Sequence, residues 1–300
     1  MACLVSHAGA LGDFITALPA MRVWRRLHPQ GRMVLLGRPA HAALCGSLFD
    51  EAWDSASARL ASLFGGAPDP RLAGTMRGFD AALLFSPASS PLAAGLAALG
   101  VRGIVRQDPF PPDSGGAGQV HVVDYHLSLF PPWAVTDGER IPLIECADLR
   151  EAGAVSPGTV AIAFGSGSER KNWPLERFAA LAGRLAARGA PVAWIAGPAE
   201  QGAWMPREWP AWRECSLSVL ASRLARCALY VGNDSGVSHL AAAAGCPSIV
   251  LFGTTNPALW APRGARVSIV SSGGQGMEGI GLQEVLERAE HFIAANAAEL

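Results

Sequence analysis

Residues Tyr230–Gly253 read YVGNDSGVSHLAAAAGCPSIVLFG, an order that predicts a buried strand, a polar turn, a helix and a second buried strand. The turn at 232–236 combines helix-capping side chains with glycines that let a backbone approach a ligand closely. The alanines at 241–244 predict a slim helix that packs tightly against a sheet. The start of such a helix presents free N–H groups and a positive dipole end, which suits a phosphate. A turn that does no more than start a helix has the same residues, so this stretch alone leaves both interpretations open.

Strands and helices alternate in the same way along both halves of the chain. After a glycine turn at 9–13, a helical pattern continues to His28 and Pro29, with Pro19 as a kink or as part of its first full turn. The alternation predicts an α/β protein with two doubly wound, Rossmann-like parallel sheets, whose ligands lie at the carboxyl ends of the strands. The apolar runs predict strands at 2–8, 32–37, 81–85, 103–105, 160–164 and 192–196, and helices at 41–49, 92–99, 121–130, 175–188, 217–226 and 282–296.

The two halves are separated by residues 131–158, which are rich in proline and glycine and show little periodicity. We therefore expect an N-terminal domain at 1–150 and a C-terminal domain at 151–300. Whether the last helix packs back on the N-terminal domain stays open at this stage.

The composition excludes several classes of protein. The net charge is −1, from 24 Lys+Arg and 25 Asp+Glu, so no nucleic-acid partner is expected. The six cysteines form no C-x-x-C pair and the seven histidines are scattered, which indicates buried free thiols in a reducing compartment and no metal site. The first residues lack the features of a signal peptide, and no apolar run reaches the length of a transmembrane helix. We expect a cytosolic protein with a sizeable core.

An oxidoreductase with a dinucleotide cofactor is one alternative for this fold class. Gly9 and Gly12 lack the middle glycine of G-x-G-x-x-G, and Gly165 and Gly167 are followed by Arg170 where the third glycine would stand. No P-loop motif is present either. Both kinds of nucleotide site are therefore disfavoured, and no cofactor is expected.

Charged side chains that follow the predicted strands indicate a different chemistry. Lys171 is the only lysine among 24 basic residues, and a compact ammonium is not equivalent to a guanidinium as a point charge in a tight site. Together with the helix start at 234–236, it could hold a diphosphate. Asp13, at a helix start in the other half, either faces that diphosphate or simply favours the helix dipole. A carboxylate base and fixed positive groups at a departing phosphate are what glycosyl transfer requires.

His239 lies one helical turn after Ser235, so it can face the same anion. The alternative is a core histidine beneath the helix.

The motifs at these positions resemble glycosyltransferase family 9, the bacterial ADP-heptose:lipopolysaccharide heptosyltransferases. The combination of G-D, K-x-W-P and N-D-[ST]-G-x-x-H is specific, whereas each motif alone is weak. The matching segments span both halves in the right order: GALGDFITALPAMRVWRRLHP at 9–29, HVVDYHLSLF at 121–130, GSGSERKNWPLERFAALAGRL at 165–185 and VGNDSGVSHLAAAAGCPSIVLFGTTNP at 231–257.

This resemblance implies a GT-B fold, in which two Rossmann-like domains face each other across a cleft. The N-terminal domain is then on the acceptor side, and the C-terminal domain binds the sugar nucleotide. The implied reaction is an inverting, metal-independent transfer of heptose from ADP-heptose to a lipid-linked or oligosaccharide acceptor of the lipopolysaccharide core. The implied location is the cytoplasm, with peripheral contact at the inner membrane. A transferase with another sugar nucleotide or acceptor, or a catalytically silent sugar-nucleotide-binding protein, remains as an alternative.

The same resemblance implies roles for individual residues. Asp13 takes the place of the catalytic base. Glu200 is near the position of an acid that contacts the nucleotide ribose, although that alignment could shift to Gln201. The implied donor-binding residues are Gly12, Ser166, Lys171, Glu200, Asp234, Ser235, Gly236 and His239.

The chain departs from the family pattern at three positions. His7 stands where arginine is frequent, and Thr254 and Asn256 stand where proline and aspartate are usual. These departures bear on the acceptor more than on the donor. A tryptophan-rich stretch, from Trp204 to Trp212, either contacts a lipid surface or an acceptor or packs in the core.

Overall fold

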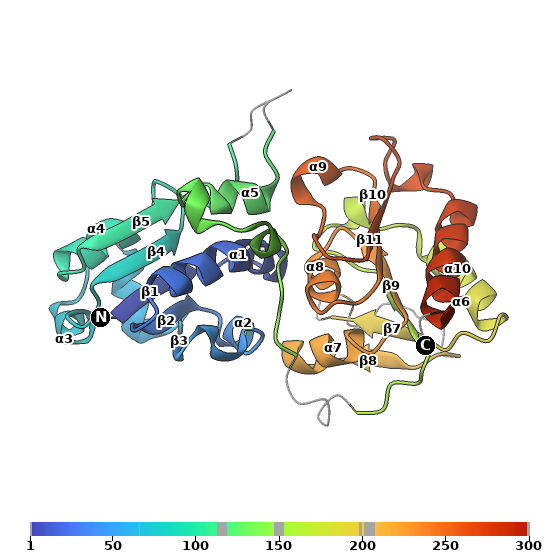
Figure 1. Cartoon of the computed structure of the whole chain (residues 1–300), viewed down its shortest axis with the longest axis horizontal. Helices are drawn as coiled ribbons and strands as arrows, with labels where there is room; N and C mark the ends of the chain where they lie inside the picture. Colours follow the sequence, from blue (N-terminus) through green and yellow to red (C-terminus); the bar gives the residue numbers. More distant parts are fainter. Residues whose placement is uncertain are drawn as a thin grey trace. The chain divides into compact units, whose positions relative to one another are not determined.

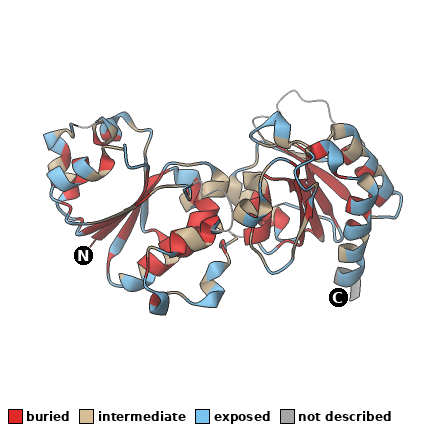
Figure 2. Ribbon diagram, turned by 90° about the horizontal axis from the view of Figure 1, so that it is seen from above, coloured by how far each residue is buried: buried red, intermediate tan, exposed pale blue. Residues whose placement is uncertain are grey.

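The computed structural model describes residues 2–65, 67–112, 119–146, 153–197, 200 and 208–298, the side chains only as far as 295. The chain divides into two compact units, residues 1–140 and 141–300. Each unit carries its own parallel β-sheet, and in both the central strands are buried (Figures 1 and 2).

The first unit is built on five parallel strands in the order β3-β2-β1-β4-β5. The central strand β1 is buried along its whole length, and its first four residues are apolar on both faces. It pairs with β2 on one side and with β4 on the other. The strands are β1 Ala2–His7, β2 Arg32–Gly37, β3 Glu51–Asp54, β4 Ala81–Phe85 and β5 Gly103–Gln107.

Helices cover the first sheet, and α1 packs against α5. Helix α1 continues through Pro19 without a break and buries Phe14, Leu18 and Met21. Leu4 and Leu84 pack in a core cluster with residues of α4 and of a long 3₁₀ segment, η2. The helices are α1 Leu11–Leu27, α2 Pro39–Ala42, α3 Ala73–Met76, α4 Leu92–Ala98 and α5 Val122–Leu127, with 3₁₀ turns η1 Gly46–Leu48, η2 Ala58–Phe64, η3 Pro70–Leu72, η4 Pro132–Ala134 and η5 Asp137–Arg140.

The second unit is built on six parallel strands in the order β11-β10-β9-β6-β7-β8. After β6 the chain adds β7 and β8 on one side, and it then returns to add β9, β10 and β11 on the other. The order in which strands are added therefore reverses between β6 and β9, which is the switch point of the sheet. The strands are β6 Val160–Ala163, β7 Val192–Ala196, β8 Ala211–Arg213, β9 Leu229–Asn233, β10 Ser248–Phe252 and β11 Val267–Ser271.

The core of the second unit is rich in aromatic residues. Trp173, Trp194 and Phe178 are fully buried, and the indole N–H of Trp173 donates to the carbonyl of Ile280 at 3.0 Å. Helix α10 packs against α6, and α8 packs against β9 and β10. The helices are α6 Leu175–Ala186, α7 Leu217–Leu224, α8 Gly236–Ala243, α9 Pro257–Trp260 and α10 Leu282–Ala298, with 3₁₀ turns η6 Glu169–Lys171 and η8 Met277–Gly279.

The prediction of two parallel α/β sheets is confirmed, but several elements differ from expectation. The helix predicted at 41–49 is wrong, because only a single turn, α2, and the short turn η1 form there. The sequence did not predict β3, β8 and β11, which are short or only partly buried edge strands.

In the sequence, the first unit ends at Arg140 and the second begins at Ile141, ten residues before the predicted boundary at 150. The reason lies in hydrogen bonds of the segment that follows. The amide of Ile144 donates to the carbonyl of Ala243 at 3.2 Å, so this segment is bound to the second unit.

Candidate functional site

The predicted donor-binding residues of the second unit follow three neighbouring strands. Ser166 and Lys171 follow β6, Glu200 follows β7, and Asp234 and Ser235 follow β9. These strands lie side by side in the order β9-β6-β7, so their carboxyl ends share one edge of the sheet. Ligands of doubly wound sheets bind at this edge, at the switch point where the strand order reverses.

An ion pair joins the loops on the two sides of the switch point. The Nζ of Lys171 donates to the Oδ2 of Asp234 at 2.8 Å, although 63 residues separate the two in sequence. The hydroxyl of Thr255 donates to the same oxygen at 2.7 Å. The Asp234 side chain is 8% exposed and that of Lys171 is 34% exposed, so the ammonium is the more accessible partner. The pair fixes a cation at the edge of the sheet.

Asn233, the last residue of β9, binds the segment that follows β6 through its side chain. We did not assign this role from the sequence. Its Nδ2 donates to the carbonyl of Phe164 at 2.7 Å, and its Oδ1 accepts from the amide of Trp173 at 3.0 Å. Asn233 is fully buried, and both ends of its amide are hydrogen-bonded. The signal was present in the sequence, because an amide side chain at the end of a buried strand needs such partners.

Helix α8 begins at this edge without the expected side-chain cap. Ser235 occupies the N-cap position with extended backbone angles, but its side chain makes no capping hydrogen bond. Within the described part of the chain, the amides of Gly236 and Val237 donate no hydrogen bond. These N–H groups, together with the helix dipole, can bind an anion.

The other predicted residues of this unit are placed less directly. His239, on α8, is buried, with 7% exposure. The hydroxyl of Ser166 donates to the carbonyl of Ser168 at 2.8 Å, within its own turn. The structure therefore brings Lys171, Asp234 and the start of α8 together, but it does not bond Ser166 to them.

Glu200 lies against the ends of two neighbouring strands. Its Oε2 accepts from the amide of Gly197, after β7, at 2.8 Å. A Cβ added to Gly165, after β6, would come within 1.8 Å of the other carboxylate oxygen. A side chain at 165 would therefore displace the carboxylate. Gln201, the alternative in the alignment, lies outside the described residues.

The predicted base, Asp13, lies on the first unit in the first turn of α1, directly after Gly12. Its Oδ2 accepts from the amide of Ala10 at 3.2 Å, so the carboxylate also stabilises the helix start. A Cβ added to Gly9 would come within 2.9 Å of the His7 ring and within 3.2 Å of the Asp13 carboxylate. The imidazole and the carboxylate thus both lie close to the position where a Cβ of residue 9 would project.

Three buried histidines lie in the same unit as Asp13. Burial, with the nearby imidazoles of His126 and His41, lowers the pKa of His7 from 6.5 to about 3. Burial lowers the pKa of His41 to about 4, with a contribution from the charge of Arg38, and burial lowers the pKa of His126 to about 4. All three are neutral near pH 7.

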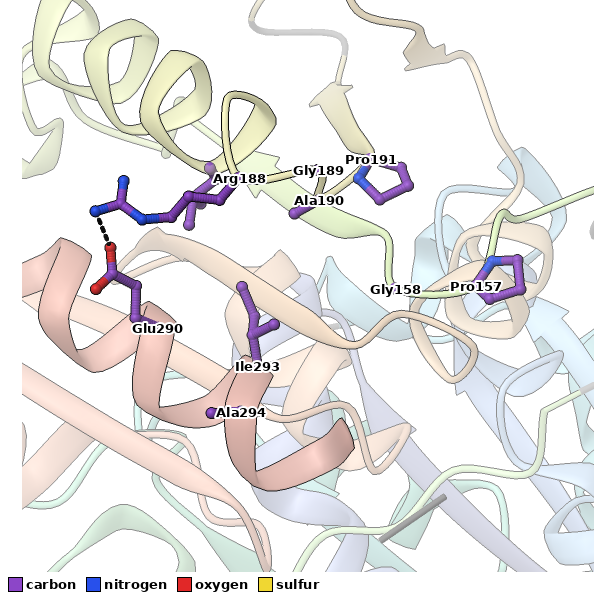
Figure 3. Close-up of a pocket in the computed structure, with 10 residues that line it drawn as sticks. Pro157, Gly158, Arg188, Gly189, Ala190, Pro191, Glu290, Ile293 and Ala294 are labelled. Atoms are coloured by element: carbon purple, nitrogen blue, oxygen red, sulfur yellow. Dashed lines mark ion pairs between the residues drawn. The ribbon is translucent and has the colours of Figure 1, made fainter. Parts of the chain in front are cut away.

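A cavity of the second unit lies at the end of its sheet that is opposite to Lys171 and Asp234. It has a volume of about 500 Å³ and is lined by α10, the end of α6 and the segments before β6 and β7 (Figure 3). Arg188 and Glu290 form an ion pair of 2.9 Å at its rim. Because Gly158 and Pro191 precede their strands, the cavity lies at the amino ends, opposite to the edge that holds Lys171.

The described residues contain no group of three or more metal-ligating side chains. Within the same residues no helix has the length and apolar composition that crossing a membrane requires. The six cysteines are unpaired, and four are buried whereas Cys146 and Cys215 are partly exposed. Trp204 lies outside the described residues, while Trp209 packs near Trp194 with ring centroids 6.2 Å apart.

Comparison with known proteins identifies a related family. The family model described as glycosyltransferase family 9 (heptosyltransferase) matches residues 121–288. A comparison with curated proteins gave no match.

Solved structures match over almost the whole chain. A family 9 glycosyl transferase from Veillonella parvula has a TM-score of 0.80 at 20% identity and covers 98% of this chain and 97% of its own. The ADP-heptose lps heptosyltransferase II of E. coli has a TM-score of 0.80 at 17% identity, covering 99% and 100%. E. coli heptosyltransferase WaaC, solved with ADP, has a TM-score of 0.70 at 19% identity, covering 97% and 100%. At these identities the likeness establishes the fold, two parallel-sheet domains of the GT-B type.

Proposed function

The chain belongs to glycosyltransferase family 9, the heptosyltransferase family, and from that premise we propose that it transfers heptose from ADP-heptose to an acceptor of the lipopolysaccharide-core type. The observation that supports this proposal most is the Lys171–Asp234 pair beside the start of α8, at the switch point of the second sheet. A fixed ammonium and free helix amides suit a diphosphate. We propose that Glu200, whose carboxylate is bound at the adjacent strand end by the amide of Gly197, accepts hydrogen bonds from the ribose hydroxyls.

The proposed reaction is a single displacement at the anomeric carbon. The Asp13 carboxylate takes the proton of the acceptor hydroxyl while that oxygen forms a bond to the anomeric carbon. The bond from that carbon to the diphosphate breaks, and ADP leaves with the electron pair. Lys171 and the amides of Gly236 and Val237 stabilise the charge on the leaving phosphate, so no metal ion is required. Attack opposite to the leaving group inverts the anomeric configuration.

The acceptor is proposed to be lipid-linked or an oligosaccharide, with peripheral contact at the cytoplasmic face of the inner membrane. Trp133, in η4 of the first unit, supports a surface contact because the residue is 79% exposed. Tryptophan is enriched at membrane interfaces. Sedimentation with anionic phospholipid vesicles measures this contact, and Trp133→Ala should weaken it. Equal sedimentation of the variant and the wild-type protein would assign the contact elsewhere.

A transfer assay tests the proposed reaction. The protein is incubated with a lipopolysaccharide core lacking heptose and with ADP-heptose, UDP-glucose or GDP-mannose, with and without EDTA. We expect transfer from ADP-heptose alone, unchanged by EDTA, and an inverted anomeric configuration by NMR. Transfer from another donor would contradict the proposed sugar nucleotide. Loss of activity in EDTA that added metal restores would contradict metal independence.

A further inference from the structure

A buried chain of hydroxyls lies beneath the start of α8. Tyr230 on β9 is fully buried, and its hydroxyl lies 3.0 Å from the Oγ of Ser238 on α8. The Oγ of Ser238 lies 3.4 Å from the Oγ of Ser235, and it also donates to the carbonyl of Asn233. Ser238 therefore joins β9, the turn and the helix at one buried point.

The carbonyl of Asn233 determines which group donates in each hydrogen bond among these hydroxyls. A carbonyl oxygen can only accept, so the proton of Ser238 is committed to it. Ser238 then acts as acceptor toward its other neighbours, and the hydroxyls of Tyr230 and Ser235 are the donors. Burial raises the pKa of Tyr230, which keeps its hydroxyl protonated for this role.

Gly232 leaves room for the side chain of Tyr230, because it has no side chain of its own. A Cβ added there would lie 2.1 Å from the Tyr230 hydroxyl and 2.6 Å from the carbon that bears it. The ring therefore lies along the strand, over the position where residue 232 has no side chain. The tyrosine and the glycine form one arrangement that carries the hydroxyl to Ser238.

These hydrogen bonds affect the side chain of Ser235, at the N-cap of α8. A serine at the N-cap position ordinarily accepts a hydrogen bond from the second or third helical amide, but Ser235 makes no such bond. Its hydroxyl is turned toward Ser238 instead. We propose that Ser238, supported by Tyr230, is a positioning residue that holds Ser235 away from its capping bond and so keeps the first amides of α8 open for the diphosphate of the donor. This inference rests on the proposed function.

The test removes the hydroxyl chain without leaving a buried donor unpaired. In Tyr230→Phe/Ser238→Ala both hydroxyl partners become apolar, a change that costs less stability than the loss of one partner alone, and the carbonyl of Asn233 loses only its Ser238 donor. Ser235 is then free to cap the helix and compete with the ligand. We expect binding of ADP and of inorganic pyrophosphate to weaken about five-fold, the equivalent of one N-cap bond. The thermal midpoint should stay close to that of the wild-type protein.

Adding Ser235→Ala separates this mechanism from general damage. Once the competing hydroxyl is gone, the triple variant should bind ADP as tightly as Ser235→Ala alone. Equal losses from the double substitution with and without Ser235→Ala would overturn the proposal, and so would unchanged affinity of the double variant. Tyr125→Phe, which removes the other tyrosine hydroxyl of the chain, is the matched control.

Amide hydrogen exchange provides a readout that needs no ligand. In the double variant, the amide of Val237, the second of the helix, should exchange more slowly than in the wild-type protein, because the side chain of Ser235 now protects it. Unchanged exchange would contradict the proposal. If the wild-type protein binds neither ADP nor pyrophosphate, the proposed donor site is wrong, whereas the exchange measurement still decides the role of Ser238.

Discussion

At the scale of single residues, Lys171 stands out in the composition of the chain and in the structure. It is the only lysine in a chain whose other basic residues are all arginine. Its ammonium is bound by Asp234, whose second donor is Thr255. The carboxylate thus holds the cation in place at the strand ends, while a third of the lysine side chain stays exposed to a ligand.

Lys171→Ala should weaken ADP binding by about ten-fold or more. A hydrogen bond to a charged group contributes about 1.5–3 kcal/mol, and about 1.4 kcal/mol corresponds to a factor of ten. Isothermal titration calorimetry measures the change. The matched control is Arg170→Ala, which removes an exposed neighbouring cation and should leave the affinity within about two-fold. Equal effects of the two substitutions would show that general charge, not the held ammonium, binds the nucleotide.

Asp13→Asn should lower the transfer rate by about 10²–10⁴-fold, the usual contribution of a general base. ADP affinity should not change, because Asp13 lies on the first unit whereas the proposed diphosphate site lies on the second. Rate and affinity are measured on the same preparation. Glu176→Gln serves as control, since Glu176 is another acid in a first helical turn. Wild-type turnover of Asp13→Asn would disprove the assignment of the base.

At the scale of elements, β9 and α8 form the unit on which the donor site depends. The strand is buried on both faces, and the helix that follows is short and rich in alanine, so it packs closely on the sheet. Gly245, with a φ of +80°, ends the helix where only glycine adopts this conformation without strain. The sequence predicted this strand–turn–helix–strand order, but it could not show that the N-cap serine leaves its helix uncapped.

Gly232→Ala should reduce the free energy of unfolding of the second unit by about 1–3 kcal/mol, as overpacking in a core does. The new methyl would collide with the fully buried Tyr230 side chain. Denaturant unfolding followed by tryptophan fluorescence gives the value. Gly183→Ala is the control: no atom lies within 4 Å of its added Cβ, so a helical alanine there should stabilise by about 0.5–1 kcal/mol. Equal stability of the two variants would contradict the packing argument.

At the scale of the whole molecule, the chain consists of two units with separate cores. The first unit buries three of the described histidines, whereas the second buries one, His239. His7, His41 and His126 are all buried in the first unit, and all have lowered pKa values. The acid sensitivity of the two units should therefore differ as well.

The first unit should lose stability as the pH falls below about 6.5. In the unfolded chain these histidines bind protons from that pH downward, whereas in the folded unit they stay neutral until pH 3–4. Within this window each buried histidine can contribute a loss that approaches about 1.4 kcal/mol per pH unit. Above pH 6.5 the effect is absent. Hydrogen exchange by mass spectrometry at pH 7.5 and 5.5 should show earlier opening of β1, β2 and α5 at the lower pH.

Two substitutions test the origin of this pH dependence. His126→Gln removes one buried imidazole and should reduce the difference in stability between pH 7.5 and 5.5. His291→Gln, at an exposed position of α10, should leave the difference unchanged. A pH dependence that survives His126→Gln undiminished would place its cause in other groups.

The sequence by itself determined the α/β class, the central strands and the family, because continuous apolar runs, glycine stops and the motifs around Asp13, Lys171 and Asp234 are local properties of the chain. It missed the edge strands β3, β8 and β11, since short and partly exposed strands carry a weak hydrophobic pattern. Only the tertiary structure decided the order of the strands and hence the switch point between β6 and β9. It also decided which side chain binds Lys171. These features arise from pairing between residues far apart in the sequence, where local periodicity contains no information.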